Sequence, residues 1–238
     1  MEENSLQGRV ALVTGGGTGI GREIALALSR AGARVALSGR RAEKLQGVAR
    51  ELEAAGTIGR AIQADVRDPA AVSALVETIE HDMGPLDIVI NNAATFARGE
   101  VRELEVEKWN DVIATNLTGA FLVTRAALPG MVQRRRGSIV FISSTSGKRG
   151  DPGLAAYSAA KFGLMGLAHS LLYEVRRHDI RVIVVSPSLI DTRHEQPDYN
   201  TVKGVTAHAA DVAESVVHCL RLPGRAMVRE LEIWGTNP

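Results

Sequence analysis

The sequence has little cysteine, few aromatic residues and almost no net charge. Its 238 residues include one cysteine, Cys219, so no disulfide can form within the chain, and we expect a buried thiol in a reducing compartment. Lysine and arginine number 28 against 27 aspartates and glutamates, which leaves no overall field to attract nucleic acid or an anionic membrane. We therefore expect a small-molecule partner and no nucleic acid.

Membrane segments and metal-ligand patterns are also missing. The opening "MEENSLQGRV" is acidic and polar where a signal peptide is basic and then apolar. No uninterrupted apolar run approaches the roughly 20 residues that a membrane span needs. The six histidines show no H-E-x-x-H or clustered ligand spacing. We expect a soluble, cytoplasmic protein with no membrane contact and no catalytic metal.

The chain does contain apolar, β-branched runs that alternate with longer amphipathic segments. The apolar runs predict strands at Val10 to Val13, Val35 to Leu37, Ala61 to Gln63, Leu86 to Ile90, Ile139 to Ile142, Val182 to Val185 and Val228 to Ile233. Helical periodicity predicts helices at Gly19 to Ala31, Ala42 to Ala55, Pro69 to Met83, Val106 to Met131, Ala155 to Arg177 and Asp211 to Leu220. This alternation predicts a single α/β domain over residues 1–238, with a parallel sheet and helices on both faces.

A glycine-rich segment, "TGGGTGIG" at residues 14–21, connects the first strand to the first helix. Gly15 permits a sharp turn, Gly19 lets backbone amides approach a pyrophosphate, and Gly21 allows close packing of helix on sheet. The helix N-terminus adds its positive end. A glycine-rich turn without a ligand is the alternative, but the position between strand and helix favours a dinucleotide site.

The end of the second strand, "VALSGRR", bears on which dinucleotide is bound. Gly39 stands where an acidic residue would bind the adenosine ribose and repel a 2′-phosphate. Arg40 and Arg41 offer charge-assisted hydrogen bonds to such a phosphate, although loop arginines are often simply solvated. Asp65, after the third strand, could accept from the adenine amino group or cap the helix that begins at Pro69. We expect NADP(H) to be favoured over NAD(H), with Arg40 as the main determinant.

The segment "YSAAK" places Tyr157 and Lys161 four residues apart in a predicted helix, and therefore on one helical face. A lone pair of this kind is usually an ordinary surface pair. A phenol with a pKa near 10 is a slow acid at neutral pH, and a neighbouring ammonium group lowers that pKa. The spacing is thus compatible with acid–base catalysis, which the other segments of the chain favour.

Six segments together resemble the short-chain dehydrogenase/reductase family over essentially the whole length of the chain. They are "TGGGTGIG", "NNAA" at 91–94, Asn116 in "ATNLTG", "ISS" at 142–144, "YSAAK", and "SPSLIDT" at 186–192. The resemblance implies a doubly wound Rossmann domain with a seven-stranded parallel sheet in the order 3-2-1-4-5-6-7. It also implies hydride transfer between NAD(P) and a carbonyl or alcohol.

The resemblance implies a catalytic tetrad of Asn116, Ser144, Tyr157 and Lys161. Tyr157 would be the proton donor and Ser144 the second hydrogen-bond donor, chosen over Ser143 because it lies 13 residues before Tyr157. Lys161 would also hold the nicotinamide ribose, and Asn116 would support a proton-relaying water. The predicted cofactor-binding residues are Gly15, Gly17, Thr18, Gly19, Ile20, Gly21, Arg40, Arg41, Asp65, Val66, Asn92, Ala93, Tyr157, Lys161, Pro187, Ile190 and Thr192.

The chain departs from the family pattern in several places. Ala94 and Ser188 replace usual glycines, and Thr18 stands where many NADP-linked relatives have a basic residue. The stretch 193–210 is short for the family's substrate-covering loop, which implies an open and tolerant site. Phe96, Leu154 and the loop after Thr192 are expected to shape the pocket, and His194 and Glu195 are weaker candidates for ligand contact.

Three functions are compatible with these features. The leading one is an NADPH-linked carbonyl reductase similar to 3-oxoacyl-[acyl-carrier-protein] reductases. The second is an NAD-linked dehydrogenase of a secondary alcohol or sugar, which Gly39 and Arg40 disfavour. The third is a non-catalytic, cofactor-binding redox sensor, which has no use for Tyr157 and Ser144.

The helix that carries Tyr157 also predicts an assembly. The segment "AAYSAAKFGLMGLAHSLLYEV" is apolar around much of its circumference, too much for a helix with one face in water. A second copy related by a two-fold axis would cover it. We expect a homodimer or homotetramer.

Overall fold

Seven parallel strands form the centre of the protein. The computed structural model describes residues 6–192 and 207–236. The sheet order is β3-β2-β1-β4-β5-β6-β9, which confirms the predicted order because β9 is the seventh strand of this sheet. Its strands are β1 (Val10–Thr14), β2 (Arg34–Gly39), β3 (Gly59–Gln63), β4 (Leu86–Asn91), β5 (Gly137–Ile142), β6 (Ile180–Pro187) and β9 (Glu230–Ile233). Short strands β7 (Ile190–Asp191) and β8 (Ala207–His208) pair separately.

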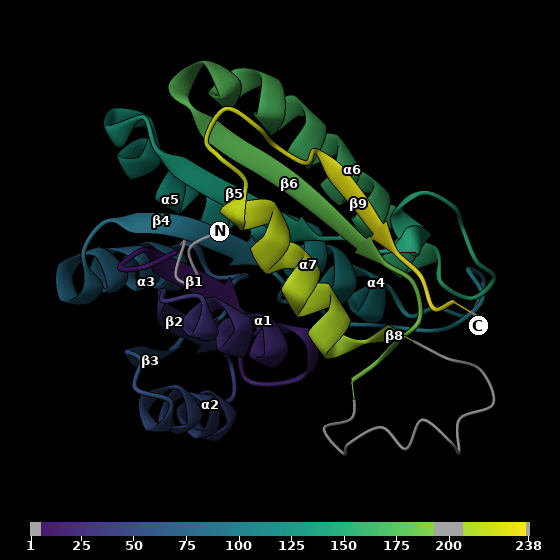
Figure 1. Ribbon diagram of the computed structural model, residues 1–238. Coiled ribbons are helices and arrows are strands. Elements are labelled where there is room, and N and C mark those ends of the chain that lie inside the picture. The colour runs from purple at the N-terminus through teal and green to yellow at the C-terminus, as the bar shows by residue number, and fades with distance from the viewer. Residues whose placement is uncertain (1–5, 193–206, 237–238) are drawn as a thin grey trace.

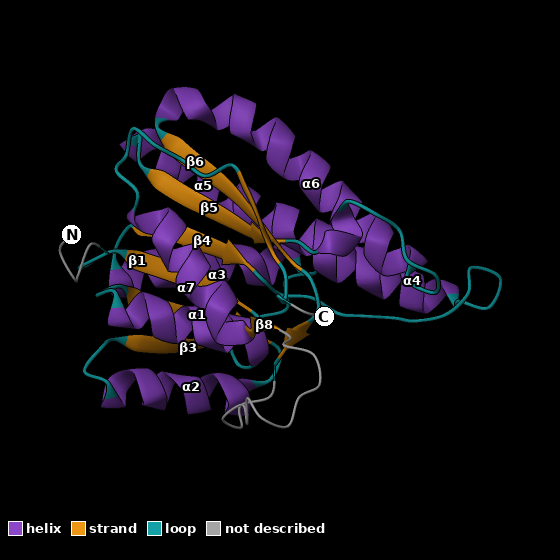
Figure 2. Ribbon diagram, turned by 45° about the vertical axis from the view of Figure 1, so that its right-hand side comes forward, coloured by secondary structure: helices purple, strands orange, loops and turns teal. Residues whose placement is uncertain are grey.

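Helices cover both faces of the sheet, as the alternating pattern predicts (Figures 1 and 2). One face packs against α1 (Gly19–Arg30), α2 (Ala42–Ala54) and α7 (Ala209–Arg221). The other packs against α3 (Pro69–Met83), α5 (Gly119–Arg134) and α6 (Ala155–Val175). Neighbouring strand residues alternate between the two apolar clusters, with Ile88 in one and Val89 in the other, because successive side chains of a strand point to opposite faces.

The ends of two helices correct details of the sequence prediction. Asp68 caps α3, since its carboxylate accepts hydrogen bonds from the amides of Ala70 and Ala71 at 2.9 and 3.3 Å. The alternative in which Asp65 caps this helix is therefore wrong. Helix α7 begins at Ala209, so the far end of the loop expected at 193–210 is β8 and the first turn of α7. Residues 193–206, with His194 and Glu195, lie outside the described residues.

The single helix predicted from Val106 to Met131 is interrupted. Helix α4 (Val106–Ile113) passes into a π-helical turn, Ala114–Thr118, which we call the π turn, and then into α5. The amide of Gly119 donates to the carbonyl of Ala114, five residues back. Such insertions occur often at functional sites, and this one turns Asn116 inward until its exposed fraction is 1%.

The stretch Val106–Arg134 is also apolar enough, over an 18-residue window with mean hydropathy 1.2, to cross a membrane, which the run lengths alone did not indicate. Its packing gives a simpler reason for that composition. Ala120, Val123, Ala127 and Met131 are buried in the cluster between α5 and the sheet. This is the arrangement of a core helix in a soluble protein.

Candidate active site and cofactor pocket

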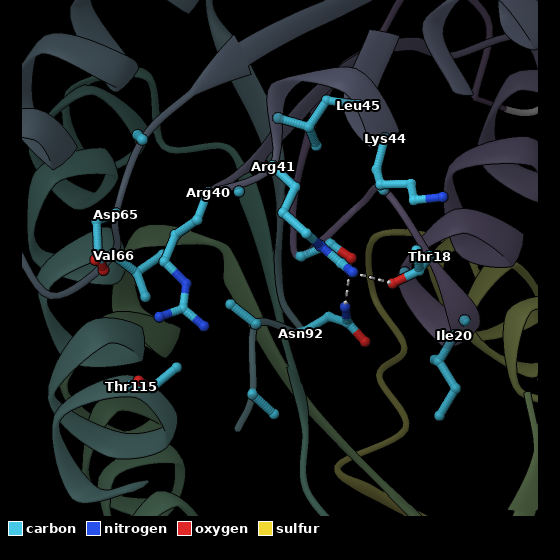
Figure 3. A pocket seen from close by; sticks show the side chains of 18 of the residues that line it. Thr18, Ile20, Arg40, Arg41, Lys44, Leu45, Asp65, Val66, Asn92 and Thr115 are labelled. Carbon is cyan, nitrogen blue, oxygen red and sulfur yellow. Dashed lines mark hydrogen bonds between the residues drawn. The ribbon is translucent and has the colours of Figure 1, made fainter. Parts of the chain in front are cut away.

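A pocket of about 620 Å³ opens at the carboxyl edge of the sheet, where the strands of a doubly wound fold bind ligands (Figure 3). Most of the predicted cofactor residues line it, namely Gly15, Gly17, Thr18, Gly19, Ile20, Gly21, Arg40, Arg41, Asp65, Val66, Asn92, Ala93 and Thr192. The lining also includes residues outside the predicted set, namely Gly39, Lys44, Leu45, Ala64, Ala94 and Thr115. Residues from several distant segments thus meet at one hollow.

The glycine-rich loop has no room for side chains at its two tightest points. Gly15 has φ 65°, and a Cβ there would lie 3.0 Å from the Asn92 side chain. A Cβ on Gly21 would lie 2.3 Å from the Gly15 carbonyl oxygen. The predicted turn and close packing are therefore confirmed. Because α1 begins at Gly19, its first amides have no partner within the helix and lie at the pocket.

Thr14 links the backbone segments at the base of the pocket through hydrogen bonds. The sequence prediction did not include it in the site. Its hydroxyl donates to the carbonyl of Ile90 at 3.1 Å and accepts from the amides of Asn92 and Ala93 at 3.0 and 3.1 Å. The Asn92 side chain donates to the carbonyl of Thr14 at 2.9 Å. These bonds join the ends of β1 and β4. A hydroxyl residue immediately before the first glycine was the available sequence signal.

Three cations gather at one end of the pocket, after β2. Arg41 donates to the Thr18 hydroxyl at 3.3 Å. The guanidinium of Arg40 has no hydrogen bond or ion pair with any described residue, and in Figure 3 it lies on the side of Asp65 and Val66. Lys44, on the first turn of α2, was missed, although its position three residues after Arg41 in a predicted helix is readable. A Cβ on Gly17 would lie 3.0 Å from the Lys44 Cβ.

The carboxylate of Asp65 lines the pocket but is already engaged. It accepts from the Arg67 amide at 3.0 Å, from its Nε at 3.0 Å and from its Nη2 at 2.6 Å. These hydrogen bonds, together with the charge of Arg40, hold the pKa of Asp65 below its usual value, so that it stays ionised. A contact between Asp65 and adenine stays a prediction.

Tyr157 and Lys161 lie on one face of α6, as their spacing predicts. The Lys161 ammonium nitrogen is 5.5 Å from the centroid of the Tyr157 ring. Ser144, after β5, is the serine that interacts with the Tyr157 hydroxyl and lowers its pKa, and its own oxygen accepts from the amide of Ser146 at 3.1 Å. Ser143 is 3% exposed, and its hydroxyl has no partner among the described residues. Of the two serines, Ser144 is the one that meets Tyr157.

The protonation of this pair differs from the sequence expectation. Burial raises the pKa of Tyr157, and the hydrogen bond from Ser144 offsets only part of that rise. Burial also lowers the pKa of Lys161 to about 8, and its ammonium donates to the Ile142 carbonyl at 2.7 Å. The expected lowering of the phenol pKa by Lys161 is wrong for this structure, because desolvation outweighs the charge of an amine directed at a carbonyl.

Asn116 braces the loop that follows β4. Its amide oxygen accepts from the Thr95 amide at 2.7 Å, and its amide nitrogen donates to the Thr95 carbonyl at 2.9 Å. The next residue, Phe96, contacts the Tyr157 ring edge to face, with the centroids 5.2 Å apart. Each end of the Asn116 amide thus makes one hydrogen bond to Thr95, which precedes Phe96, and each end keeps one further hydrogen-bonding site. The predicted water at Asn116 stays a prediction.

The remaining predicted residues lie after β6. Thr192 lines the pocket, and a Cβ on Gly19 would lie 3.6 Å from it. Pro187 pairs with Ile233 at the end of β6, and Ile190 pairs with Ala207, so neither lines the pocket. Their cofactor contacts stay predictions. Within 6–192 and 207–236 no three His, Cys, Asp or Glu residues group as metal ligands, and the predicted absence of a metal also stays a prediction.

Comparison with known proteins gives the family. The family model described as "short chain dehydrogenase" matches residues 9–203. The chain belongs to the short-chain dehydrogenase family. It is 37% identical over 188 residues to the 3-oxoacyl-[acyl-carrier-protein] reductase FabG of Escherichia coli, covering 79% of this chain and 76% of that protein. It is 42% identical over 185 residues to a putative ketoacyl reductase of Streptomyces coelicolor, covering 77% and 71%.

Solved structures agree in fold over almost the whole chain. A metagenomic short-chain oxidoreductase in complex with NADP has a TM-score of 0.87 and 34% identity, with 98% of this chain and 100% of that chain covered. A variant of the actinorhodin polyketide ketoreductase with NADPH also has a TM-score of 0.87 and 34% identity, covering 95% and 96%. The protein is thus an NAD(P)-dependent oxidoreductase with the predicted Rossmann fold.

The pocket fits such a cofactor on its own geometry. The glycine backbone and the free amides of α1 suit a pyrophosphate, and a Cβ at Gly15 or Gly21 would close that space. Arg40, Arg41 and Lys44 lie at the end where the adenosine of a bound dinucleotide is expected. Thr115, beside Asn116, lines the same pocket, whereas Tyr157 and Lys161 are not among its lining residues, so their cofactor contacts stay predictions.

Proposed function

We propose that the protein is an NADPH-preferring carbonyl reductase that converts 3-oxoacyl thioesters, or closely similar ketones, into secondary alcohols. The observation that carries this proposal is the contact of Tyr157 with Ser144 and Lys161, beside a pocket with glycines at one end and three cations at the other. The reaction is reversible in principle.

The geometry of Ser144 and Tyr157 supports their assigned roles in reduction. NADPH, when bound, supplies the hydride. Addition of hydride to a carbonyl leaves negative charge on the oxygen, which needs donors already aimed at it. Because the Ser144 oxygen accepts from the Ser146 amide, its hydrogen remains available to donate. The raised pKa of Tyr157 keeps its proton in place at neutral pH, and that proton passes to the substrate oxygen.

Lys161 supports Tyr157 from the same helix face. With a pKa of about 8 it gains and loses a proton near neutral pH, and it is 3% exposed. We assign it to the return of a proton to Tyr157 and to holding the nicotinamide ribose. Asn116 acts through Thr95, since its side chain fixes the loop that carries Phe96.

Two observations support the preference for NADPH. Gly39 supplies no carboxylate to bind the ribose diol or to repel a 2′-phosphate, and the guanidinium of Arg40 has no hydrogen bond or ion pair with the described residues. Lys44 adds a second cation close to Gly17. Lys44 supplies the basic group that many NADP-linked relatives have at the position of Thr18. Thr18 itself accepts a hydrogen bond from Arg41.

The substrate class is supported by the relatives. Two curated relatives are named for reduction of 3-oxoacyl or ketoacyl groups, and one solved neighbour is a polyketide ketoreductase. An NAD-linked dehydrogenase of an alcohol or sugar, and a non-catalytic sensor, are the alternatives. The contact between Ser144 and Tyr157 disfavours the sensor, because binding alone has no need of a paired proton donor.

The test is a kinetic panel of 3-oxoacyl thioesters, simple ketones, aldehydes and sugars, each with NADPH and NADH. The proposal expects the highest kcat/KM for 3-oxoacyl thioesters with NADPH. A clear preference for NADH with an alcohol or sugar would select the dehydrogenase alternative. Cofactor binding without turnover of any member of the panel would select the sensor.

The proposal includes a cytoplasmic homo-oligomer. Between α5 and α6 lies an apolar groove of about 380 Å³, lined by Phe121, Leu128, Pro129, Leu167 and Leu171 among others. Phe121 is 45% exposed and Tyr173 is 62% exposed, and both lie on these helices. A second copy would cover this face. Light scattering at micromolar concentration should show a dimer or tetramer, and Phe121→Glu should weaken it.

A further inference from the structure

The loop that follows β3, residues 64–68, contacts the π turn region from both sides. On one side the Arg67 guanidinium bridges two carboxylates, those of Asp65 in the same loop and Asp111 on α4. On the other side the Val66 side chain packs against Gly119, the first residue of α5, where a Cβ would lie 2.6 Å from Val66 Cγ2. Asp111 precedes the π turn and Gly119 follows it, so the loop contacts the chain on both sides of the π turn.

The residues that these contacts join lie in different parts of the site. Asp65 and Val66 line the cofactor pocket beside Arg40. Asp111 instead lines a separate groove of about 500 Å³, together with Phe96 and Val112. The π turn between them carries Asn116, which binds Thr95 and thereby sets Phe96 against Tyr157. A continuous series of contacts therefore joins the adenine end of the pocket to the ring of Tyr157.

We infer that Arg67 is a positioning residue that couples occupation of the adenine end of the pocket to the placement of the π turn and of Asn116. The inference rests on the proposed function for its effect on turnover. A ligand at Asp65 and Val66 restrains the loop, and the loop restrains the π turn through Asp111 and Gly119. By linkage, an ordered π turn also favours the ligand. Partly exposed ion pairs are individually weak, so the effect is on geometry more than on stability.

The first test does not require turnover. Hydrogen exchange of the amides of residues 114–119 is measured with and without saturating 2′,5′-ADP, which lacks the nicotinamide. In the wild type we expect exchange to slow by about fivefold or more, the lower end of usual coupling between sites. In Arg67→Met and in Asp111→Ala this slowing should be clearly smaller, because only the packing of Val66 on Gly119 then joins the loop to the π turn. Asp111 lies outside the cofactor pocket, so Asp111→Ala should still bind 2′,5′-ADP with nearly unchanged affinity.

Arg60→Met is the matched control. Arg60 donates to Asp82 at 2.8 Å, an exposed pair that joins β3 to α3 and has no contact with α4. This variant should keep the full slowing of exchange. Equal slowing in all three variants, or none in the wild type at saturation, overturns the coupling. A wild type that binds 2′,5′-ADP without any change at 114–119 leaves the cofactor assignment standing, whereas one that binds no adenine nucleotide overturns both.

The second test uses kinetics. Arg67→Met and Asp111→Ala should each lower kcat by roughly threefold to tenfold, and the double variant should fall no further, because both remove the same link. Asp111→Ala should leave the KM for NADPH within about twofold of the wild type, since affinity differences of that size are small on the scale of a lost contact. Additive losses in the double variant, or a KM effect without a kcat effect, contradict a positioning role.

Discussion

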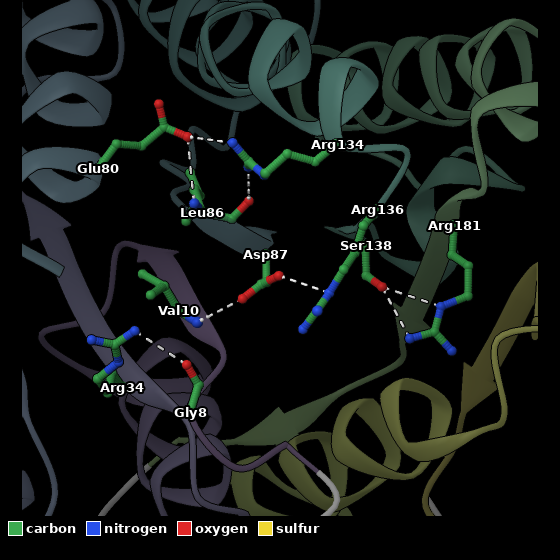
Figure 4. A network of polar contacts seen from close by, with 10 residues as sticks. All are labelled: Gly8, Val10, Arg34, Glu80, Leu86, Asp87, Arg134, Arg136, Ser138 and Arg181. Atoms are coloured by element: carbon green, nitrogen blue, oxygen red, sulfur yellow. Dashed lines mark hydrogen bonds and ion pairs between the residues drawn. The ribbon is translucent and has the colours of Figure 1, made fainter. Parts of the chain in front are cut away.

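The two edges of the sheet use their arginines in opposite ways. At the amino edge the side chains are committed to the protein itself (Figure 4). Arg134 donates to Glu80 at 3.3 Å and to the Leu86 carbonyl at 3.0 Å, and Arg136 pairs with Asp87 at 3.1 Å. Arg181 is 9% exposed and donates to the Ser138 hydroxyl and to the carbonyls of Leu220 and Leu222.

At the carboxyl edge, polar groups are left uncommitted. Within the described chain, the guanidinium of Arg40 has no hydrogen bond or ion pair, and the hydroxyls of Thr115, Ser143 and Ser158 are buried without a partner. Among the residues that the structure describes, the amino edge has one such atom, the Nε of Arg34. Buried polar groups are normally hydrogen-bonded, so a concentration of unsatisfied groups marks the edge at which a ligand is expected.

This comparison also bears on the basic run at Arg134 to Arg136. From the sequence, the run could complement a helix end or dock an acidic carrier protein. All three guanidinium groups bind acceptors of the same chain, with Arg135 on Asp179 at 2.8 Å and on the Arg177 carbonyl at 2.9 Å. The interpretation in which these arginines bind groups of their own chain is therefore favoured over docking of a carrier protein.

Removing the proton donor at the carboxyl edge should give the largest effect. Tyr157→Phe keeps the ring against Phe96 and removes the hydroxyl, so kcat should fall by about 10² to 10⁴-fold while NADPH still binds. The measurements are steady-state turnover and fluorescence titration of the cofactor. Tyr173→Phe, on the same helix but on the face proposed to meet a second copy, is the control; it keeps the ring that would make that contact, and its turnover should equal that of the wild type. Near-normal turnover in Tyr157→Phe would sink the mechanism.

Replacing one arginine at each edge should distinguish cofactor binding at the carboxyl edge from structural bonding at the amino edge. Arg40→Ala should lower kcat/KM for NADPH by roughly 10- to 150-fold, the value of one charge-assisted contact, without changing that for NADH. Arg136→Ala, at the amino edge, should leave both values unchanged. The readout is kcat/KM with each cofactor. A wild type that already prefers NADH would show that the cationic end has been misassigned.

Replacement of Arg181 tests whether the arginines at the amino edge stabilise the fold. Arg181→Met leaves the Ser138 hydroxyl and two carbonyls without their donor, so the free energy of unfolding should fall by about 1–3 kcal/mol with kcat/KM unchanged. Chemical denaturation measures this. Arg30→Met, which removes an exposed pair with Glu214, should change stability by less than about 1 kcal/mol. Equal losses in the two variants would remove the distinction between the edges.

The buried lysine should make stability depend on pH. Because the pKa of Lys161 is about 8 in the folded protein and 10.5 in the unfolded chain, the unfolded state binds more protons between these values. The cost of burying the charge is fully present below pH 8 and disappears as the pH rises to 10.5. The wild type should therefore gain about 3 kcal/mol of stability relative to Lys161→Met across this window, at about 1.4 kcal/mol for each pKa unit. Parallel pH profiles for the two proteins would contradict the burial of a charged amine.

Much of the fold and part of the site could be predicted because they depend on local pattern. Apolar runs of strand length and helical periodicity fixed the order of elements, and the spacing of Tyr157 and Lys161 placed them on one helical face. Gly15 and Gly21 were identifiable because a turn and a close approach exclude a Cβ. Each of these features depends on residues that are near one another along the chain.

Other features depend on distances between segments that are far apart in sequence, and only the tertiary structure decided them. The direction of the Lys161 ammonium, and hence the failure of the predicted pKa shift at Tyr157, depends on where Ile142 lies and on how much water is excluded. The hydrogen bonds of Asn116 to Thr95 depend on how the π turn packs against the loop after β4, and the bridge from Arg67 to Asp111 depends on how α4 packs against the loop after β3. The sequence by itself determined which groups are present and which strand or helix carries them; packing determined which of those groups are already satisfied and which remain free for a ligand.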